Sequence, residues 1–259
     1  MCRNSHSPRQ GSTFRVNHPP LTSPAAISGT DIVDSGWLSL DDVPHDIATF
    51  HLLDTTVLGS PVIVLTEGRT DAWVLESALR VIKPHLVGYL RFPDFSIAPE
   101  GSAGVLVKTL KTFAAAGVQN RVVALFDNDT GAAEALRALD ESLLPRNISV
   151  MRLPDLPLAR SYPTLGPAGP DVSDVNGLAA SIELYLGEDI LRDALGELRP
   201  VQWRGYSESV GRYQGEVLHK REVQEAFESK CQAALVGERT GDWSGLELIF
   251  DSIVTLLAA

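Results

Sequence analysis

Between Pro61 and Leu153, short apolar runs alternate with segments of helical periodicity, and this alternation constrains the fold more than any other feature. We expect the first helix to begin with an N-cap at Thr70 and the second to stop at Gly117. Short connections between alternating strands and helices require parallel strands, so the sequence predicts an α/β fold with helices on both faces of a small sheet. The predicted strands are PVIVLTEG, LVGYLRF, RVVALFDND and ISVMRL, and the predicted helices are TDAWVLESALRVI, GVLVKTLKTFAAAGV and TGAAEALRAL.

The rest of the chain lacks this regular alternation of strands and helices. Residues 1–30 are rich in Ser, Pro and Asn without a hydrophobic period, which predicts a disordered leader. Residues 31–60 regain apolar side chains and predict an irregular lead-in that packs on the core. Residues 61–155 would form the α/β domain, and residues 156–259 a mostly helical extension that completes the site. Within this extension we expect a long loop rich in Pro and Gly, helices in NGLAASIELYLG and EDILRDALGEL, a strand or loop from PVQW onward, and two C-terminal helices.

Composition and charge exclude several classes of protein. The 259 residues hold 33 Asp and Glu against 22 Lys and Arg, and the formal net charge of −11 argues against bulk electrostatic capture of DNA or RNA. Cys2 and Cys231 form no CxxC pair, which excludes a disulfide framework and a thiolate zinc site. No apolar run reaches the roughly 18 residues of a membrane span, and no apolar segment follows the basic start. We therefore expect a cytoplasmic protein with no membrane partner.

Acidic residues follow two of the predicted strands. Glu67 follows the first, Asp71 falls in the opening turn of its helix, and Asp127 and Asp129 follow the third. Because the carboxyl ends of parallel strands share one edge of a sheet, these carboxylates are expected to converge. Repelling carboxylates stay ionised only when positive charge joins them. Oxygen ligands without His or Cys favour Mg²⁺, with Mn²⁺ as a substitute.

Each acidic motif also has a plainer interpretation. The EGxxD motif could place charge that complements a helix dipole, and the DND motif could form a turn through side chain–backbone hydrogen bonds. Taken alone, each motif suits its plainer interpretation at least as well as it suits a metal site. Their joint occurrence at the ends of two buried strands, about sixty residues apart, favours a metal site.

The segments TEGRTD and LFDND, each after an apolar strand, resemble the two signature motifs of the TOPRIM domain. This metal-binding module is shared by primases, topoisomerases, RecR-type recombination proteins and OLD-family nucleases. The resemblance covers roughly residues 61–153 and implies a small, Rossmann-like parallel sheet. It also implies that Glu67 is a metal ligand or acid–base group and that Asp127 and Asp129 form a DxD metal site. Asp71 matches the acidic residue that follows the glutamate in the OLD-like branch.

The C-terminal part is similar to the tails of OLD-like and HEPN/Toprim-associated bacterial proteins. In those tails a further Glu completes a second metal site and a Lys acts in catalysis, which the resemblance places at Glu183 and Lys220. For both residues the alternative is a solvated position on a helix surface. Asp171 and Asp174 in the long loop are further candidate ligands.

These features together predict a divalent-metal-dependent nuclease that hydrolyses phosphodiester bonds in DNA, with RNA as the alternative substrate. Mg²⁺ would be the cofactor, and Mn²⁺ its substitute. Arg69 and Arg91, near the predicted sheet edge, would contact the phosphate backbone, unless they are ordinary solvated arginines. The resemblance implies a setting in bacterial antiviral defence or mobile-element conflict.

Other TOPRIM activities fit less well. A topoisomerase needs large gate domains, a primase needs a template-binding domain, and an OLD-type ATPase needs a Walker motif that does not occur here. The rival prediction is a non-catalytic TOPRIM subunit that binds nucleic acid weakly and joins a protein partner or another copy of itself. The net charge favours this rival, whereas the full set of carboxylates favours the enzyme.

Overall fold

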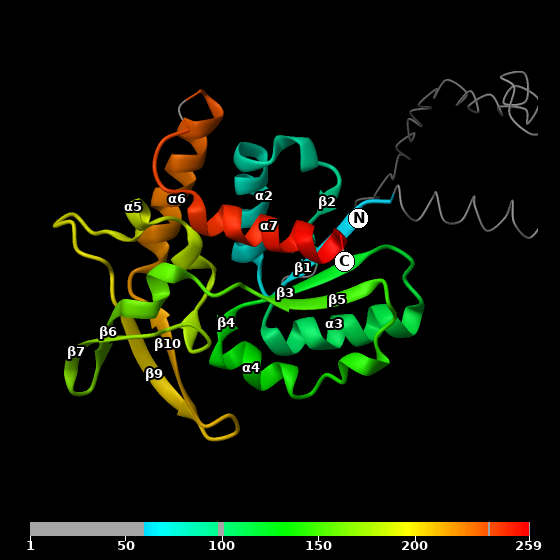
Figure 1. Cartoon of the computed structure of the whole chain (residues 1–259), viewed down its shortest axis with the longest axis horizontal. Helices are drawn as coiled ribbons and strands as arrows, with labels where there is room; N and C mark the ends of the chain where they lie inside the picture. The colour runs from blue at the N-terminus through cyan, green and yellow to red at the C-terminus, as the bar shows by residue number, and fades with distance from the viewer. Residues whose placement is uncertain (1–59, 98–100, 238, 259) are drawn as a thin grey trace, which may run out of the picture. The chain divides into compact units, whose positions relative to one another are not determined.

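The computed structural model describes residues 60–97, 101–237 and 239–258, all within one compact unit of the chain (Figure 1). The predicted leader and all of the predicted lead-in except Ser60 lie outside the described residues. Within the described ranges, no helix combines the length and the apolar character that crossing a membrane requires. The expected boundary at residue 155 stays a prediction.

Four parallel strands form the central sheet and confirm the predicted α/β class (Figure 1). The strand order is β2-β1-β3-β5, so the two strands that precede the acidic motifs are neighbours. Their residues are buried on both faces of the sheet, which is why the strands read as continuous apolar runs. The strands are β1 (Val62–Thr66), β2 (Leu90–Arg91), β3 (Val122–Phe126) and β5 (Ile148–Arg152).

Helices cover both faces of this sheet, as the alternation predicts (Figure 1). On one face, Val64 packs in a core with Leu75 of α2 (Arg69–Ile82) and Phe250 of α7 (Ser244–Ala258). On the other, Leu65 packs with Leu110 of α3 (Ala103–Ala116) and Ala132 of α4 (Thr130–Leu136). Successive strand residues thus point into two different cores.

The helix ends follow local side-chain chemistry. The α3 helix begins at Ser102, whose hydroxyl accepts the Val105 N–H, and ends at Gly117, which has a φ of 66° as expected for a left-handed cap. The expected N-cap at Thr70 is wrong, because α2 begins earlier and Gly68 is its N-cap. The Asp71 carboxylate accepts the Gly68 N–H over 2.8 Å, which satisfies the open end of the helix there.

The C-terminal extension is less helical than expected. A second four-stranded sheet, of order β10-β9-β6-β7, occupies much of it, and the predicted long loop contains the hairpin of β6 and β7. The predicted strand or loop from PVQW onward is the antiparallel pair β9 and β10. The two C-terminal helices, α6 and α7, are confirmed. The remaining bounds are β6 (Tyr162–Gly166), β7 (Gly169–Ser173), β9 (Val201–Ser207), β10 (Arg212–Val217) and α6 (Lys220–Leu235).

Neither helix expected between residues 176 and 198 forms as predicted. NGLAASIELYLG instead contains the short strand β8 (Ala179–Ala180), which pairs with β4 (Asn128–Asp129), and the 3₁₀ turn Ile182–Tyr185. Of EDILRDALGEL only α5 (Glu188–Leu191) is helical. Gly187, with a φ of 111°, separates the two segments. The apolar run 178–186 reflects burial on all sides and not a helical face.

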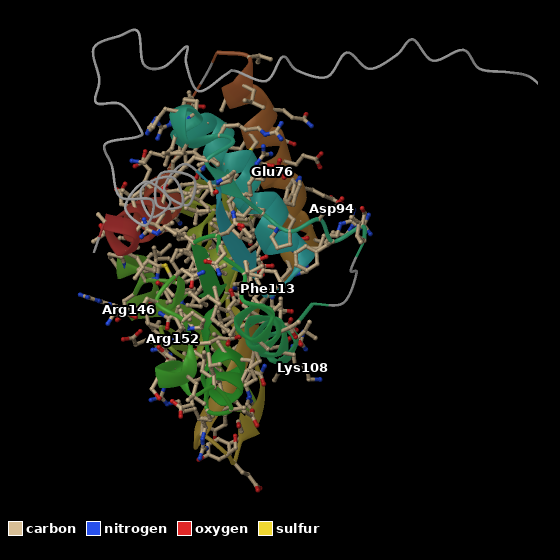
Figure 2. All side chains as sticks on the ribbon, turned by 90° about the vertical axis from the view of Figure 1, so that its right-hand side faces the viewer. Glu76, Asp94, Lys108, Phe113, Arg146 and Arg152 are labelled. Carbon is tan, nitrogen blue, oxygen red and sulfur yellow. The ribbon has the colours of Figure 1, made fainter. Side chains whose placement is uncertain are left out.

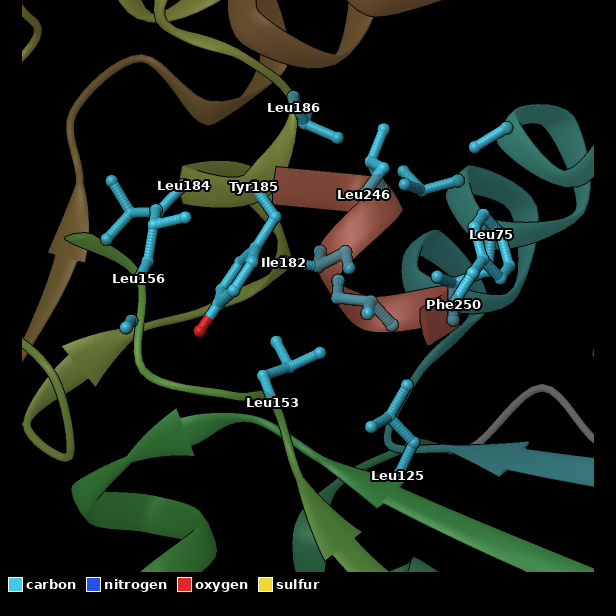
Figure 3. Close-up of a cluster of buried hydrophobic side chains, with 14 of the residues drawn as sticks. Leu75, Leu125, Leu153, Leu156, Ile182, Leu184, Tyr185, Leu186, Leu246 and Phe250 are labelled. Carbon is cyan, nitrogen blue, oxygen red and sulfur yellow. The ribbon is translucent and has the colours of Figure 1, made fainter. Parts of the chain in front are cut away.

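One apolar core joins the extension to the sheet (Figure 3). Leu125 and Leu153 contribute from the sheet side, and Leu184 and Tyr185 from the 3₁₀ turn. The Tyr185 hydroxyl donates to the carbonyl of Pro154 over 2.7 Å, so its polar end is satisfied within this core. This packing fixes the 3₁₀ turn against the carboxyl end of the sheet.

Candidate metal centre

Glu67 and Asp127 lie side by side at the carboxyl edge of the parallel sheet. They follow the paired strands β1 and β3, whose register sets Thr66 beside Leu125. The Asp127 N–H donates to Glu67 Oε1 over 2.8 Å. The structure thus brings together two motifs that are 60 residues apart in the sequence.

Glu67 and Asp71 both titrate near neutrality. Burial, together with the charges of Asp129 and Asp71, raises the pKa of Glu67 to about 7, although the hydrogen bond from Asp127 lowers it. Burial, with the charge of Glu183, also raises the pKa of Asp71 to about 7. Without a cation, these two carboxyl groups are therefore partly protonated at physiological pH.

Asp127 lies among the other acidic residues. Burial raises its pKa well above the usual value, and the charges of Asp71, Glu67, Asp129 and Glu183 raise it further. No ion pair involves Asp127 in the described part of the chain. A carboxylate in this setting needs either a proton or a cation to be stable.

Asp129 serves as the N-cap of α4, where its Oδ1 accepts the Ala132 N–H over 2.7 Å. Burial raises the pKa of Asp129, although the Ala132 hydrogen bond and the charges of Lys220 and Arg152 lower it. The plainer interpretation of the DND motif is thus satisfied structurally: Asp129 caps a helix. The cap does not remove the effect of Asp129 on its neighbours, because its charge still raises the pKa of Glu67 and of Asp127.

Glu183 and Lys220 come from the extension and meet at the same cluster. Glu183 is 4% exposed, and its Oε2 lies 3.4 Å from Lys220 Nζ. Although burial raises it, the charge of Lys220 and the hydrogen bond from Ser181 hold the pKa of Glu183 below its usual value. Gln224 donates to the second carboxylate oxygen over 3.0 Å. Glu183 is therefore no surface residue, and Lys220 is its cationic partner.

The backbone before Lys220 is strained. His219 has a φ of 59° and is the only residue other than glycine with positive φ in the described ranges. The left-handed region costs such a residue roughly 1–2 kcal/mol. It lets the chain turn from the end of β10 into α6, which begins at Lys220. Strain at a turn that aims a charged side chain is typical of functional sites.

Replacing Lys220 by Met should lower the free energy of unfolding by about 1–3 kcal/mol near pH 8, because the buried Glu183 loses its cation. The double variant E183Q/K220M should regain most of this loss, since a neutral amide needs no counter-ion. Urea unfolding would measure both. Lys108 in α3, an exposed lysine (Figure 2), gives the matched control K108M, which should change little. Equal losses of unfolding free energy in K220M and K108M would show that the ion pair of Lys220 with Glu183 contributes nothing to stability.

The donor set suits an oxygen-preferring divalent cation. A cavity of about 10 Å³ lies between Asp71 and Asp127, close to the space that one water molecule needs. All five acidic side chains offer oxygen ligands, as Mg²⁺ and Mn²⁺ prefer. However, no group of three or more His, Cys, Asp or Glu side chains in the described residues is arranged to hold a metal ion. Cation binding would therefore have to turn carboxylates away from their present partners.

Arg69 and Arg91 do not join the acidic cluster. Arg69 is exposed and lines a hollow of about 380 Å³ with Asp94. The pKa of Asp94 is lowered by hydrogen bonds from Ser96 and, less strongly, by the charge of Arg69. Arg91 is exposed on the short strand β2 and lines a different hollow of about 270 Å³. Neither guanidinium forms an ion pair with the five carboxylates in the part of the chain described.

The two further candidate ligands are both exposed, in contrast to the carboxylates of the cluster. Asp171 is exposed on β7. Asp174 is exposed, and its Oδ1 accepts the Asn176 N–H over 3.0 Å. The long segment that carries them is a hairpin with a turn of its own, so it has a structural role without any ligand.

The structure adds residues that sequence reasoning missed. Arg152 ends β5, and its charge lowers the pKa of Asp129. Figure 2 shows Arg152 on a different side of the molecule from Asp94, the neighbour of Arg69. Asn128 is 2% exposed and donates to Asp155 over 2.9 Å. Arg152 could have been found by the rule that identified the acidic motifs, because it stands at the carboxyl end of a predicted strand.

Comparisons with known proteins identify no family for this chain. No protein-family model matches it, and searches of curated proteins and of solved structures found no match either.

Proposed function

We propose that this chain is a divalent-metal-dependent nuclease of the TOPRIM type that hydrolyses phosphodiester bonds in DNA or RNA. The observation that carries the proposal is the environment of Asp127. Its carboxyl group stands at the carboxyl edge of a buried parallel sheet among four other carboxylates, and a lysine lies beside one of them. A fold gains no stability from like charges placed together, so a cationic ligand is the simplest reason to hold them there.

Glu67, Asp71, Asp127 and Asp129 would hold the first cation, and Glu183 would support a second. Bound metal of this kind activates water and stabilises the leaving oxygen of a phosphodiester. In the metal-free protein Glu67 has a pKa of about 7, so a cation that binds there at neutral pH would displace a proton from it. Lys220 stays protonated, since the charges of Glu183 and Asp127 raise its pKa against the effect of burial. Its ammonium group can therefore stabilise negative charge that develops on a phosphate.

The proposal predicts cleavage that needs a divalent cation. Purified protein should cut plasmid DNA or single-stranded DNA or RNA in Mg²⁺ or Mn²⁺ and should be inactive in EDTA. K220M should cut more slowly while binding of the first cation persists, because the proposed role of Lys220 is toward the phosphate and not toward that cation. Cleavage that survives EDTA, or that K220M leaves unchanged, would contradict the proposed site.

A second candidate function is a non-catalytic TOPRIM subunit that binds nucleic acid or a protein partner. The net charge of −11 favours it, because an autonomous nuclease usually presents a basic face. The carboxylates also have protein hydrogen-bond partners of their own, such as Gly68 for Asp71. The same assay separates the two functions: the subunit would show no metal-dependent cleavage of any substrate.

A further inference from the structure

The hairpin of β9 and β10 carries exposed aromatic rings that no core requires. Tyr206 is 55% exposed and Tyr213 is 59% exposed. They are cross-strand neighbours in an edge-to-face contact, with ring centroids 5.1 Å apart. Trp203, which is half-buried and packs against the main core, anchors the group, its ring centroid 6.2 Å from that of Tyr213. The hairpin of β9 and β10 projects from the molecule (Figure 1). Its two exposed tyrosine rings form a surface on which flat molecules can stack.

This aromatic surface adjoins the candidate metal centre. The Thr130 hydroxyl donates to the carbonyl of Tyr213 over 2.6 Å, and Thr130 directly follows Asp129. At its other end, β10 leads through His219 into Lys220. Both ends of the strand that carries Tyr213 are therefore tied to residues of the acidic cluster.

Two arginines near this junction form no ion pair with any described residue. Arg212, beside Tyr213, is exposed, and its guanidinium lies close to Gly177. Arg152 is the second, and its charge reaches Asp129. Arg204 on the same hairpin differs, because it is paired with Glu216 over 2.5 Å. Arg212 is thus the arginine available to bind an external anion beside the cluster, whereas the charge of Arg152 acts on Asp129.

We propose that this hairpin is a stacking platform for single-stranded nucleic acid, on which Tyr206 and Tyr213 bind bases and Arg212 binds a backbone phosphate. The inference rests on the proposed function and names its substrate class. An acidic protein gains little affinity from the phosphate backbone, so base stacking must supply most of it. Stacking needs unpaired bases, because the bases of a duplex already stack on each other. The platform would lead the strand directly to Lys220 and Asp129.

A cross-strand tyrosine pair also stabilises a hairpin, so the test must separate stacking from folding. The variant Y206I/Y213I keeps strand propensity and apolar bulk but removes both rings. The matched variant Y206F/Y213F keeps the rings and loses only the hydroxyl groups. Melting temperatures of both variants would show that the hairpin is intact before binding is compared.

Binding should be measured by fluorescence anisotropy in EDTA at low salt, which removes any contribution of metal or cleavage. The probes are labelled oligo(dT), oligo(U) and a blunt DNA duplex. We expect the wild type to bind the single strands and not the duplex. Y206I/Y213I should bind at least about tenfold more weakly, the loss typical of removing stacked rings, and Y206F/Y213F should bind normally. R212A should reduce the slope of the logarithm of affinity against the logarithm of salt concentration by about one, as expected for the loss of one phosphate contact.

Preference for oligo(dT) over oligo(U), or the reverse, would tell DNA from RNA. Equal binding by the wild type and Y206I/Y213I, or tighter binding of the duplex, would overturn the platform. The platform would also be overturned if no oligonucleotide bound and Y206I/Y213I turned a dimeric wild type into a monomer. The tyrosine rings would then contact a second copy of the chain. The proposed function fails separately: a chain that binds single strands through the tyrosines but never cleaves them with metal keeps the platform and loses the nuclease.

Discussion

Replacing Glu67 by Gln is expected to reduce metal-dependent cleavage by roughly 10³-fold or more while the protein stays folded. Glutamine has the size of glutamate, so its carbonyl oxygen can still accept the Asp127 N–H that joins the two motifs. What disappears is a charge and a titratable group with a pKa near 7. A group that is both ligand and acid–base partner has no substitute at the site, which is why the loss should be large.

The metal-free stability of E67Q should rise slightly, because one negative charge leaves a crowded edge. Circular dichroism and the melting temperature would establish that the variant is folded, and cleavage of the same DNA and RNA substrates would give its activity. Glu76 offers the matched control: it is exposed on α2 (Figure 2) and paired with Arg80 over 2.7 Å, so E76Q removes the same charge far from the cluster's chemistry.

E76Q should cleave as the wild type does. If E67Q kept the same residual activity as the wild type, that activity would come from a contaminating nuclease or from another site. The non-catalytic subunit would then become the better account of this chain.

The sequence predicted the parallel sheet because its two central strands, β1 and β3, are short, bounded and almost entirely buried. β3, Val122–Phe126, shows no exposed position, so its apolar run could be recognised without any tertiary contact. The strand ends then placed Glu67 and Asp127 at one edge, since parallel strands leave no choice of edge. This part of the site followed from topology alone.

The extension could not be predicted in the same way. Its segment 178–186 is apolar because it is enclosed by other parts of the chain, and an apolar run of this length suits a buried strand, turn or helix equally. Glu183 was expected on a helix surface or in the site, and only the fold shows it to be 4% exposed with Ser181 and Gln224 as partners. Contacts between segments distant in sequence decide such cases.

Mg²⁺ or Mn²⁺ should raise the melting temperature by several degrees at pH 8, and the double variant D127N/D129N should abolish that increase. Asparagine preserves the fold at both positions: it is as good an N-cap as aspartate for α4, and the backbone N–H of residue 127 still reaches Glu67. The double variant should also be more stable than the wild type without metal, because two raised-pKa carboxylates are removed from among their like charges.

The pH dependence has a definite sign. The folded-state pKa values of Glu67 and Asp71 are raised to about 7, so their protonation stabilises the folded protein fully below about pH 4. This stability is lost as the pH rises through about 7. Metal-free protein should therefore be less stable at pH 8 than near pH 5.5. Because cations bind only the ionised carboxylates, the increase in melting temperature with Mg²⁺ should be larger at pH 8 than at pH 5.5.

Asp171 and Asp174 provide the matched control, since D171N/D174N removes the same two charges from exposed positions outside the cluster. That variant should keep both the Mg²⁺ increase and its pH dependence. A Mg²⁺ increase that persists in D127N/D129N would place the cation elsewhere on this acidic protein. An increase of equal size at pH 5.5 and pH 8 would show that the bound cation does not compete with protons for Glu67 and Asp71. Only loss of the increase in D127N/D129N, with retention in D171N/D174N, assigns the cation to the carboxyl edge of the sheet.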